Sequence, residues 1–147
     1  YEGEWDYDLK LKPIEGFKIH ASWIRGIRKA QAEVKKRLNI PCPVLVMYSA
    51  SSVKPGNFRP DMKHADSVLN VEDIEHYAHG LGNNVEYAVF EGGLHDLLLS
   101  KKSVREHVLH DMEVFIDKTL PQKKSHAIRG FFHFLCLSRR TAQSKRR

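Results

Sequence analysis

His95 is the residue of this sequence whose type and position best suit chemistry. It follows an alternating run, 85–90, and the pair Gly92-Gly93, which lets the backbone turn sharply as that run ends. In a parallel α/β sheet, ligands and catalytic groups gather at the carboxyl ends of the strands. A histidine in such a loop can be a general base, a metal ligand or a hydrogen-bonded structural residue, and its type alone does not choose among them.

Asp66 is the carboxylate best placed to assist this histidine. It lies between the apolar run 44–48 and the next expected helix, and therefore after the strand that precedes the strand of His95. If the two strands are parallel neighbours, both side chains reach the same edge of the sheet. A carboxylate that accepts the Nδ1 proton fixes the imidazole tautomer and frees the other ring nitrogen to take a proton from a nucleophile. Asp61 is the rival acid, whereas Asp96 is expected to support the histidine loop.

Two other groupings could hold a metal ion. One lies on a predicted helix and comprises Glu106, His107, His110 and Asp111. Its His-x-x-His spacing lacks the glutamate pairing of a zincin motif, which favours a solvated helix face. The other comprises His64, Asp66 and His95, whose spacing matches no zinc signature. We therefore expect neither a metal nor an organic cofactor.

The elements that must position His95 and Asp66 alternate between helices and strands. Apolar residues at spacings of three and four predict amphipathic helices over about 19–38, 70–81 and 103–120. The runs 44–48 and 85–90 predict strands, and the first is continuous enough to suggest burial on both faces. This alternation predicts an α/β fold with parallel strands and right-handed crossovers. Two strands do not complete such a sheet, so we expect the C-terminal part of a larger α/β domain.

Potential capping residues predict where the helices begin and end. Ser22 is the expected N-cap of the first helix and Asn70 that of the second, which Gly82 is expected to terminate. Ser100 and Ser103 are alternative caps of the third helix, and Ser103 begins a capping box of the Ser-x-x-Glu type.

Three further segments have distinct compositions. Residues 5–11 alternate apolar and charged side chains, which predicts an extended segment with one buried face. Residues 49–65 form a long loop of the kind that is functional or mobile. The tail, 121–147, carries eight Lys or Arg and no acidic residue, whereas residues 1–120 carry 16 basic and 18 acidic residues. The body therefore lacks the charge of a nucleic-acid-binding domain, and the tail is expected to be flexible.

The composition suits one soluble domain with a core, since 41% of the 147 residues are hydrophobic and 29% are charged. No apolar run reaches 18 residues, so no membrane-spanning helix is expected. No signal peptide is visible, and because the first residue is Tyr1 we expect the chain to continue upstream. Cys42 and Cys136 form neither a disulfide framework nor a zinc site, which favours reduced thiols in a cytoplasmic protein.

Residues 3–120 resemble the C-terminal half of α/β-hydrolases of the serine aminopeptidase and monoacylglycerol-lipase-like group. The resemblance rests on the order and spacing of these segments: Gly3-Glu4-Trp5-Asp6-Tyr7-Asp8 with Lys12-Pro13, Trp23-Ile24-Arg25-Gly26-Ile27-Arg28, Pro43-Val44-Leu45-Val46, Asp66-Ser67-Val68-Leu69, and Glu91-Gly92-Gly93-Leu94-His95-Asp96. It implies that Asp66 is the catalytic acid and His95 the catalytic histidine. It also implies that residues 1–20 end a cap region and that 21–120 form a helix-strand-helix-strand-helix core.

The serine nucleophile of this family is missing from the sequence. In the α/β-hydrolase fold the serine lies in Gly-x-Ser-x-Gly, on a strained turn that precedes the acid and the histidine. No such motif occurs in the 147 residues, and Ser49, Ser51 and Ser52 lack the flanking glycines. We therefore expect the serine and the oxyanion-hole amides upstream of Tyr1, and the chain alone to be inactive.

The resemblance implies a serine hydrolase that cleaves an ester or amide of a small-molecule acyl substrate. Carboxylesterase, lipase-like and aminopeptidase-like activities are all compatible with it, because the cap and most of the substrate pocket lie outside these residues. The alternative is a non-catalytic interaction fragment that binds acidic partners through the basic tail 121–147.

Overall fold

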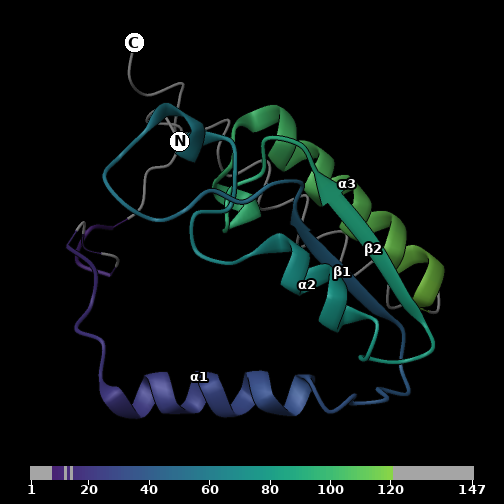
Figure 1. Cartoon of the computed structure of the whole chain (residues 1–147). Helices are drawn as coiled ribbons and strands as arrows, with labels where there is room; N and C mark the ends of the chain where they lie inside the picture. The colour runs from purple at the N-terminus through teal and green to yellow at the C-terminus, as the bar shows by residue number, and fades with distance from the viewer. Residues whose placement is uncertain (1–7, 12, 14, 121–147) are drawn as a thin grey trace. The chain divides into compact units, whose positions relative to one another are not determined.

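The computed structural model of the chain describes residues 8–11, 13 and 15–120. Helices and strands alternate along them as the sequence predicts (Figure 1): α1 (Ala21–Val34), β1 (Val44–Ser49), α2 (Val71–Ala78), β2 (Val85–Phe90) and α3 (Lys102–Thr119). Two short 3-10 helices, η1 (Pro60–Lys63) and η2 (Leu97–Leu99), lie in the connections. The chain divides into two compact units between Arg105 and Glu106, so α3 begins in the first unit and continues in the second.

The two strands pair in parallel, which confirms the prediction from the alternating elements. Val44 lies opposite Val85, and Ser49 lies opposite Phe90, so both strands end at the same edge of the sheet. Helix α2, which connects the strands, contacts β1 (Figure 1). The architecture is thus mixed α/β with a two-stranded parallel sheet that is incomplete.

Burial in the first unit is concentrated near the carboxyl ends of the strands. Apart from Ala78 in α2, its buried apolar residues belong to the strand ends, the loop before Asp66 and the first turn of α3: Tyr48, Phe90, Ala65 and Val104. Burial of β1 on both faces was predicted, but its first four residues stay partly exposed. The prediction is therefore wrong for these four residues.

The capping predictions have mixed outcomes. Asn70 is confirmed as the N-cap of α2, since its side chain accepts a hydrogen bond from the Glu72 N–H. Helix α1 begins one residue before Ser22, after the extended residue His20, whose side chain makes no capping hydrogen bond. Helix α3 begins at Lys102, which places Ser103 inside the helix. The predictions for Ser22 and Ser103 are therefore wrong.

Gly82 is required for a close backbone approach and does not terminate α2, which ends at Ala78. The segment after α1 runs beside the segment after α2, where Leu38 N–H donates to Gly80 O over 2.9 Å. A Cβ atom on Gly82 would lie 2.6 Å from the carbonyl oxygen of Ile40, closer than real Cβ contacts. The prediction that Gly82 terminates the second helix is therefore wrong, and the glycine is instead required by this contact between two connections.

Two predicted segments fall partly or wholly outside the described residues. Within the segment 5–11, the described part forms a turn in which Leu11 N–H donates to Asp8 O over 3.0 Å, so the extended conformation predicted there is wrong. The tail 121–147, with Cys136, lies outside the described residues. Cys42 is a free, exposed thiol.

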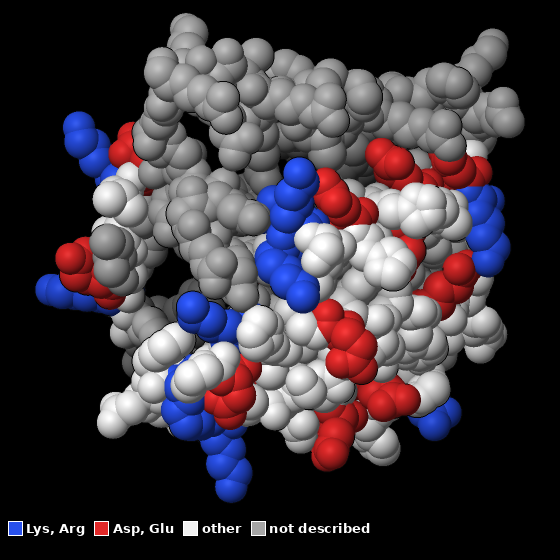
Figure 2. Space-filling model, turned by 90° about the horizontal axis from the view of Figure 1, so that it is seen from above, with Lys and Arg blue, Asp and Glu red and all other residues white. Residues whose placement is uncertain are grey.

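Charges of both signs are spread over the described surface. On the face seen in Figure 2, both carboxylates and basic groups are present, and neither sign covers the described surface alone. Among the described residues, no helix has the length and apolar character needed to cross a bilayer.

Candidate functional site

Asp66 is placed by a short parallel pairing that continues beyond the end of β1. Its N–H donates to Ser51 O and its carbonyl oxygen accepts from Val53 N–H, both over 2.9 Å. The long connection after β1 therefore returns to the strand end before α2 begins. The fold thus fixes the backbone of Asp66 beside the carboxyl end of β1.

The Asp66 carboxylate is buried and fully engaged. The residue is 3% exposed. Oδ1 accepts hydrogen bonds from the N–H groups of Val68, over 2.7 Å, and Leu69, over 2.8 Å. These two bonds satisfy backbone donors in the turn that leads to α2, and they leave Oδ2 available to accept a hydrogen bond from another group. A structural role in this turn is therefore built into Asp66.

The His95 loop begins with two glycines that serve different purposes. Gly92 has φ +70°, in the left-handed region that glycine adopts without strain. Gly93 is packed so tightly that a Cβ atom would lie 2.8 Å from Leu97 Cδ2 and 3.1 Å from Phe90 O. The backbone therefore reverses at Gly92 and presses against η2 at Gly93, which delivers His95 just past the end of β2.

Two buried serine hydroxyls hold the same loop in place. Ser49, the last residue of β1, donates from Oγ to Gly93 O over 2.8 Å. Ser100 Oγ accepts from Leu94 N–H over 2.9 Å. Both serines are at most 1% exposed. The two residues that directly precede His95 are thus anchored, Gly93 to the end of β1 and Leu94 to the chain before α3.

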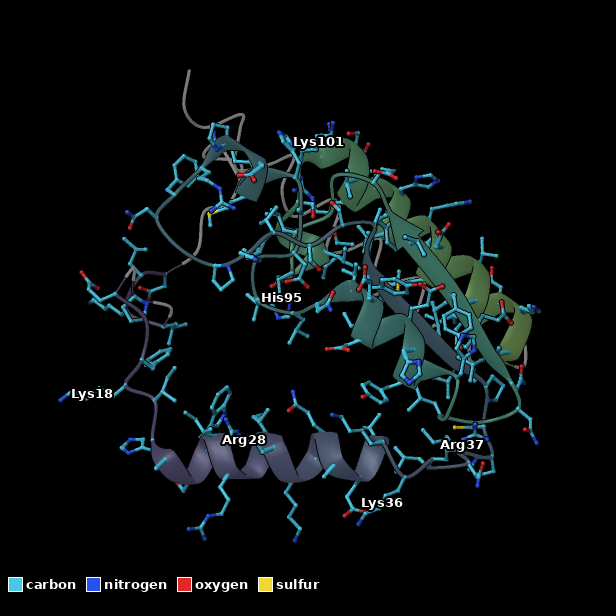
Figure 3. All side chains as sticks on the ribbon, viewed as in Figure 1. Lys18, Arg28, Lys36, Arg37, His95 and Lys101 are labelled. Atoms are coloured by element: carbon cyan, nitrogen blue, oxygen red, sulfur yellow. The ribbon has the colours of Figure 1, made fainter. Side chains whose placement is uncertain are left out.

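The loop brings His95 to Asp66. Nδ1 of His95 lies 2.9 Å from Oδ2 of Asp66, although the two residues are 29 positions apart in the sequence. The Asp66 side chain is 4% exposed, whereas that of His95 is 43% exposed. Figure 3 shows His95 in its loop, on the ribbon that follows β2. The expected meeting of these two side chains at one edge of the sheet is present in the structure.

The pKa of Asp66 determines which of the two groups carries the proton of this hydrogen bond. Burial acts most strongly on Asp66 and by itself raises the pKa, but hydrogen bonds from Leu69, His95 and Val68, with the charge of His95, outweigh it. The pKa of Asp66 therefore lies below its ordinary value of 3.8. At neutral pH the carboxylate is ionised and can only accept, so Nδ1 of His95 carries the shared proton.

The opposite ring nitrogen of His95, Nε2, is the one that could accept a proton in this arrangement. Among the described residues, the His95 ring makes its hydrogen bond through Nδ1. With the proton on Nδ1, neutral Nε2 holds a lone pair on a half-exposed side chain and can accept a proton from an incoming hydroxyl. The buried carboxylate would then stabilise the imidazolium that forms.

The rival carboxylates have other partners. Asp61 binds Arg59, with 3.2 Å between Oδ1 and Nε and 3.3 Å between Oδ2 and an Nη atom. Its side chain is 53% exposed, in contrast to that of Asp66. Asp96 accepts from Leu98 N–H over 3.2 Å and so caps η2, which confirms its expected support of the loop.

Two of the three serines near the end of β1, Ser49 and Ser52, use their hydroxyls in structural hydrogen bonds. Ser49 is buried, as described above. Ser52 Oγ donates to Leu69 O over 2.9 Å and accepts from Val71 N–H over 2.8 Å.

The sequence did not predict the roles of Ser49 and Ser100 in positioning the His95 loop. A serine directly after a strand-forming run was the available signal for the first, and nothing in the sequence distinguished the second.

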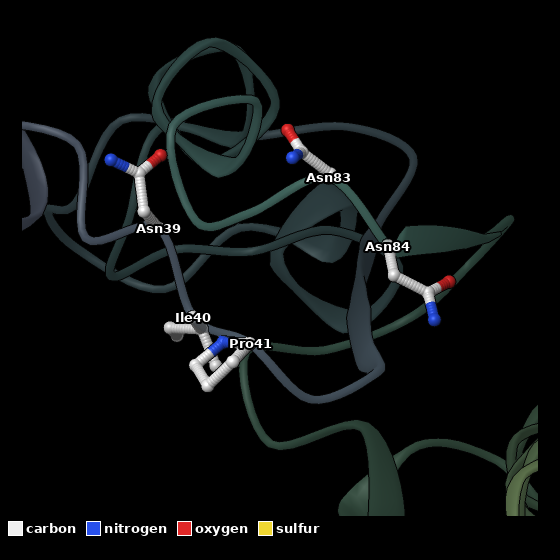
Figure 4. Close-up of a pocket in the computed structure, with 5 residues that line it drawn as sticks. All are labelled: Asn39, Ile40, Pro41, Asn83 and Asn84. Carbon is white, nitrogen blue, oxygen red and sulfur yellow. The ribbon is translucent and has the colours of Figure 1, made fainter.

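No metal centre is formed by the residues the structure describes, since no three His, Cys, Asp or Glu side chains among them are grouped to hold an ion. This includes both groupings considered from the sequence. A pocket of about 190 Å³ lies at the opposite end of the strands, lined by the residues that precede β1 and β2 (Figure 4): Asn39, Ile40, Pro41, Asn83 and Asn84. It is separate from the Asp66–His95 pair, which follows the strands.

Comparison of the chain with protein-family models, with curated proteins and with solved structures found no match. The functional argument therefore depends on the geometry of the site itself.

Proposed function

We propose that this chain carries the acid and the base of a serine hydrolase of the α/β-hydrolase type, with Asp66 as the acid and His95 as the base. The observation that supports it is the 2.9 Å contact between His95 Nδ1 and the buried Asp66 carboxylate at the carboxyl edge of a parallel sheet. A structural histidine does not need a buried, ionised partner that leaves its outer nitrogen accessible. The histidine of a Ser-His-Asp triad uses both features.

The nucleophile must come from a segment outside residues 1–147 under this proposal. Of the described serines beside the strand end, Ser49 is buried and Ser52 is hydrogen-bonded to backbone, and Ser51 lacks the flanking glycines of a nucleophile turn. A serine from such a segment would approach Nε2 of His95, attack an ester or amide carbonyl, and pass its proton to the ring. His95 would then return that proton to the leaving group and activate water for deacylation.

Covalent labelling tests this function. The chain extended upstream through its coding sequence should contain Gly-x-Ser-x-Gly and should react with a fluorophosphonate at that serine. Labelling should fall sharply in His95→Ala, because the serine loses its base. The 147-residue chain should remain unlabelled. An extended chain without the motif, or one labelled equally well in His95→Ala, would show that His95 is not the base of a hydrolase.

The interaction-fragment alternative predicts a different outcome. Binding to acidic partners through the tail 121–147 would be sensitive to salt and indifferent to His95. Loss of fluorophosphonate labelling on His95→Ala in the extended chain therefore favours the hydrolase. Binding to acidic partners that is lost only on removal of the tail favours the alternative.

A further inference from the structure

The chains that leave β1 and β2 take different partners just past the strand ends. The Ala50 N–H donates to Phe90 O over 2.9 Å, which extends the pairing of the strands by one hydrogen bond. The chain after β1 then forms a parallel bridge with Asp66. The chain after β2 turns at Gly92, where φ is +70°, and leads to His95. The backbone segments that hold the acid and the base therefore separate at this point.

The hydroxyl of Ser49 lies between these two segments. Its Oγ is 2.8 Å from Gly93 O, two positions before His95, and 3.0 Å from Ser51 O. The same Oγ accepts from the Ser51 N–H over 3.4 Å. Ser51 O in turn accepts from the Asp66 N–H over 2.9 Å. One hydroxyl thus contacts both the loop of the base and the backbone partner of the acid.

From these contacts we propose that Ser49 is a positioning residue that couples the Asp66 segment to the His95 loop. The contact between Asp66 Oδ2 and His95 Nδ1 depends on the relative placement of these two segments, which Ser49 joins. Ser49 is 1% exposed and Gly93 is buried, so removal of the hydroxyl would leave a buried carbonyl oxygen without this donor.

Ser100 has a different part in the same loop. Its Oγ accepts from the Leu94 N–H over 2.9 Å, which holds the loop to the chain before α3. Its hydroxyl makes no hydrogen bond to the described chain around Asp66. Of the two buried serines, Ser49 is therefore the one that joins the acid side to the base side.

A role of Ser49 in catalysis rests on the proposed function, because the position of the imidazole proton matters to a general base. The coupling itself can be measured in the 147-residue chain without any turnover. Failure of the coupling would leave the fluorophosphonate test of the hydrolase unaffected, and absence of labelling would leave the coupling measurable.

The tautomer of His95 is the direct readout, measured from its ring ¹⁵N shifts with the imidazole neutral. Ser49→Ala should lower the ratio of the Nδ1–H to the Nε2–H tautomer about fivefold, the equivalent of about 1 kcal/mol for one hydrogen bond. Ser49→Thr keeps the hydroxyl and should keep the ratio close to wild type, even where its added methyl group lowers the free energy of unfolding. A purely structural role would change the free energy of unfolding without changing the ratio.

Ser52→Ala is the matched control. The Ser52 hydroxyl binds Leu69 O and Val71 N–H on the Asp66 side and makes no hydrogen bond to the described His95 loop. This variant should lower the free energy of unfolding and leave the tautomer ratio close to wild type. If Ser49→Ala does not fold, Ser49→Cys replaces it, because the thiol is a weaker donor and should lower the ratio in the same direction.

Two results would overturn the proposal. An unchanged ratio in the Ser49→Ala or Ser49→Cys variant, with a lower free energy of unfolding, would make Ser49 a structural residue only. Equal changes of the ratio in Ser49→Ala and Ser52→Ala would show that the link to the His95 loop has no special part. A ratio that falls in Ser49→Ala and is kept in both Ser49→Thr and Ser52→Ala would support the coupling.

Discussion

The His95 ring is held through Nδ1 by Oδ2 of Asp66, over 2.9 Å, while Oδ1 of the same carboxylate binds the N–H groups of Val68 and Leu69. One buried carboxylate therefore organises both the turn before α2 and the orientation of the imidazole. The two oxygens divide these tasks. The effect of an Asp66 substitution on the His95 tautomer can therefore be measured separately from its effect on the free energy of unfolding.

Asp66→Asn should reverse the tautomer of His95. The amide nitrogen of an asparagine would donate toward the ring, so Nδ1 would become the acceptor and the proton would move to Nε2. The ¹⁵N chemical shifts of the two ring nitrogens report this exchange directly. Asp61→Asn is the matched control, because Asp61 is exposed and paired with Arg59. Unchanged ring shifts in Asp66→Asn would contradict the proton assignment.

The lowered pKa of Asp66 predicts a stability contribution that depends on pH. Because the folded-state pKa lies below the ordinary 3.8, this contribution is fully present above that value and is lost as pH falls through the folded pKa. The free energy of unfolding of the wild-type chain should therefore exceed that of Asp66→Asn at pH 7. The difference should narrow below about pH 4. Denaturant unfolding at several pH values measures it, and a difference that stays constant would rule out a depressed pKa.

Gly93→Ala should destabilise the loop that carries His95. The added methyl would meet Leu97 Cδ2 at 2.8 Å and Phe90 O at 3.1 Å, and the backbone oxygen cannot yield without disturbing the end of β2. We expect a loss of about 1–3 kcal/mol in the free energy of unfolding. Gly26→Ala, in α1, meets nothing within 4 Å and should be neutral or stabilising by up to about 1 kcal/mol. Equal effects of the two substitutions would contradict the packing argument.

The sequence predicts the site because each of the two strands can be recognised from a local pattern of residues. Val44–Tyr48 and Val85–Phe90 have clear strand patterns, and parallel pairing then brings the residues after both strands to one edge. Asp66 and His95 follow from that argument without knowledge of side-chain packing. The choice of Asp66 over Asp61 rested on the resemblance, and the burial of Asp66 now gives it a physical basis.

What the sequence could not predict depends on contacts between distant segments. The bond from Ser49 Oγ to Gly93 O joins residues 44 positions apart, and no local pattern indicates it. Gly82 resembles a helix terminator until Ile40 is known to lie against it. The periodicity of α1 identifies an apolar face but not what covers it, and Trp23 remains largely exposed.

The most direct test of the central claim is ester hydrolysis by the chain extended to include a Gly-x-Ser-x-Gly segment. We predict that His95→Ala lowers kcat on the order of a millionfold and that Asp66→Asn lowers it about 10⁴-fold, with Asp61→Asn close to wild type. Circular dichroism should show that each variant keeps its fold. Full turnover in Asp66→Asn or His95→Ala would contradict the assignment of this pair as the acid and base of a hydrolase.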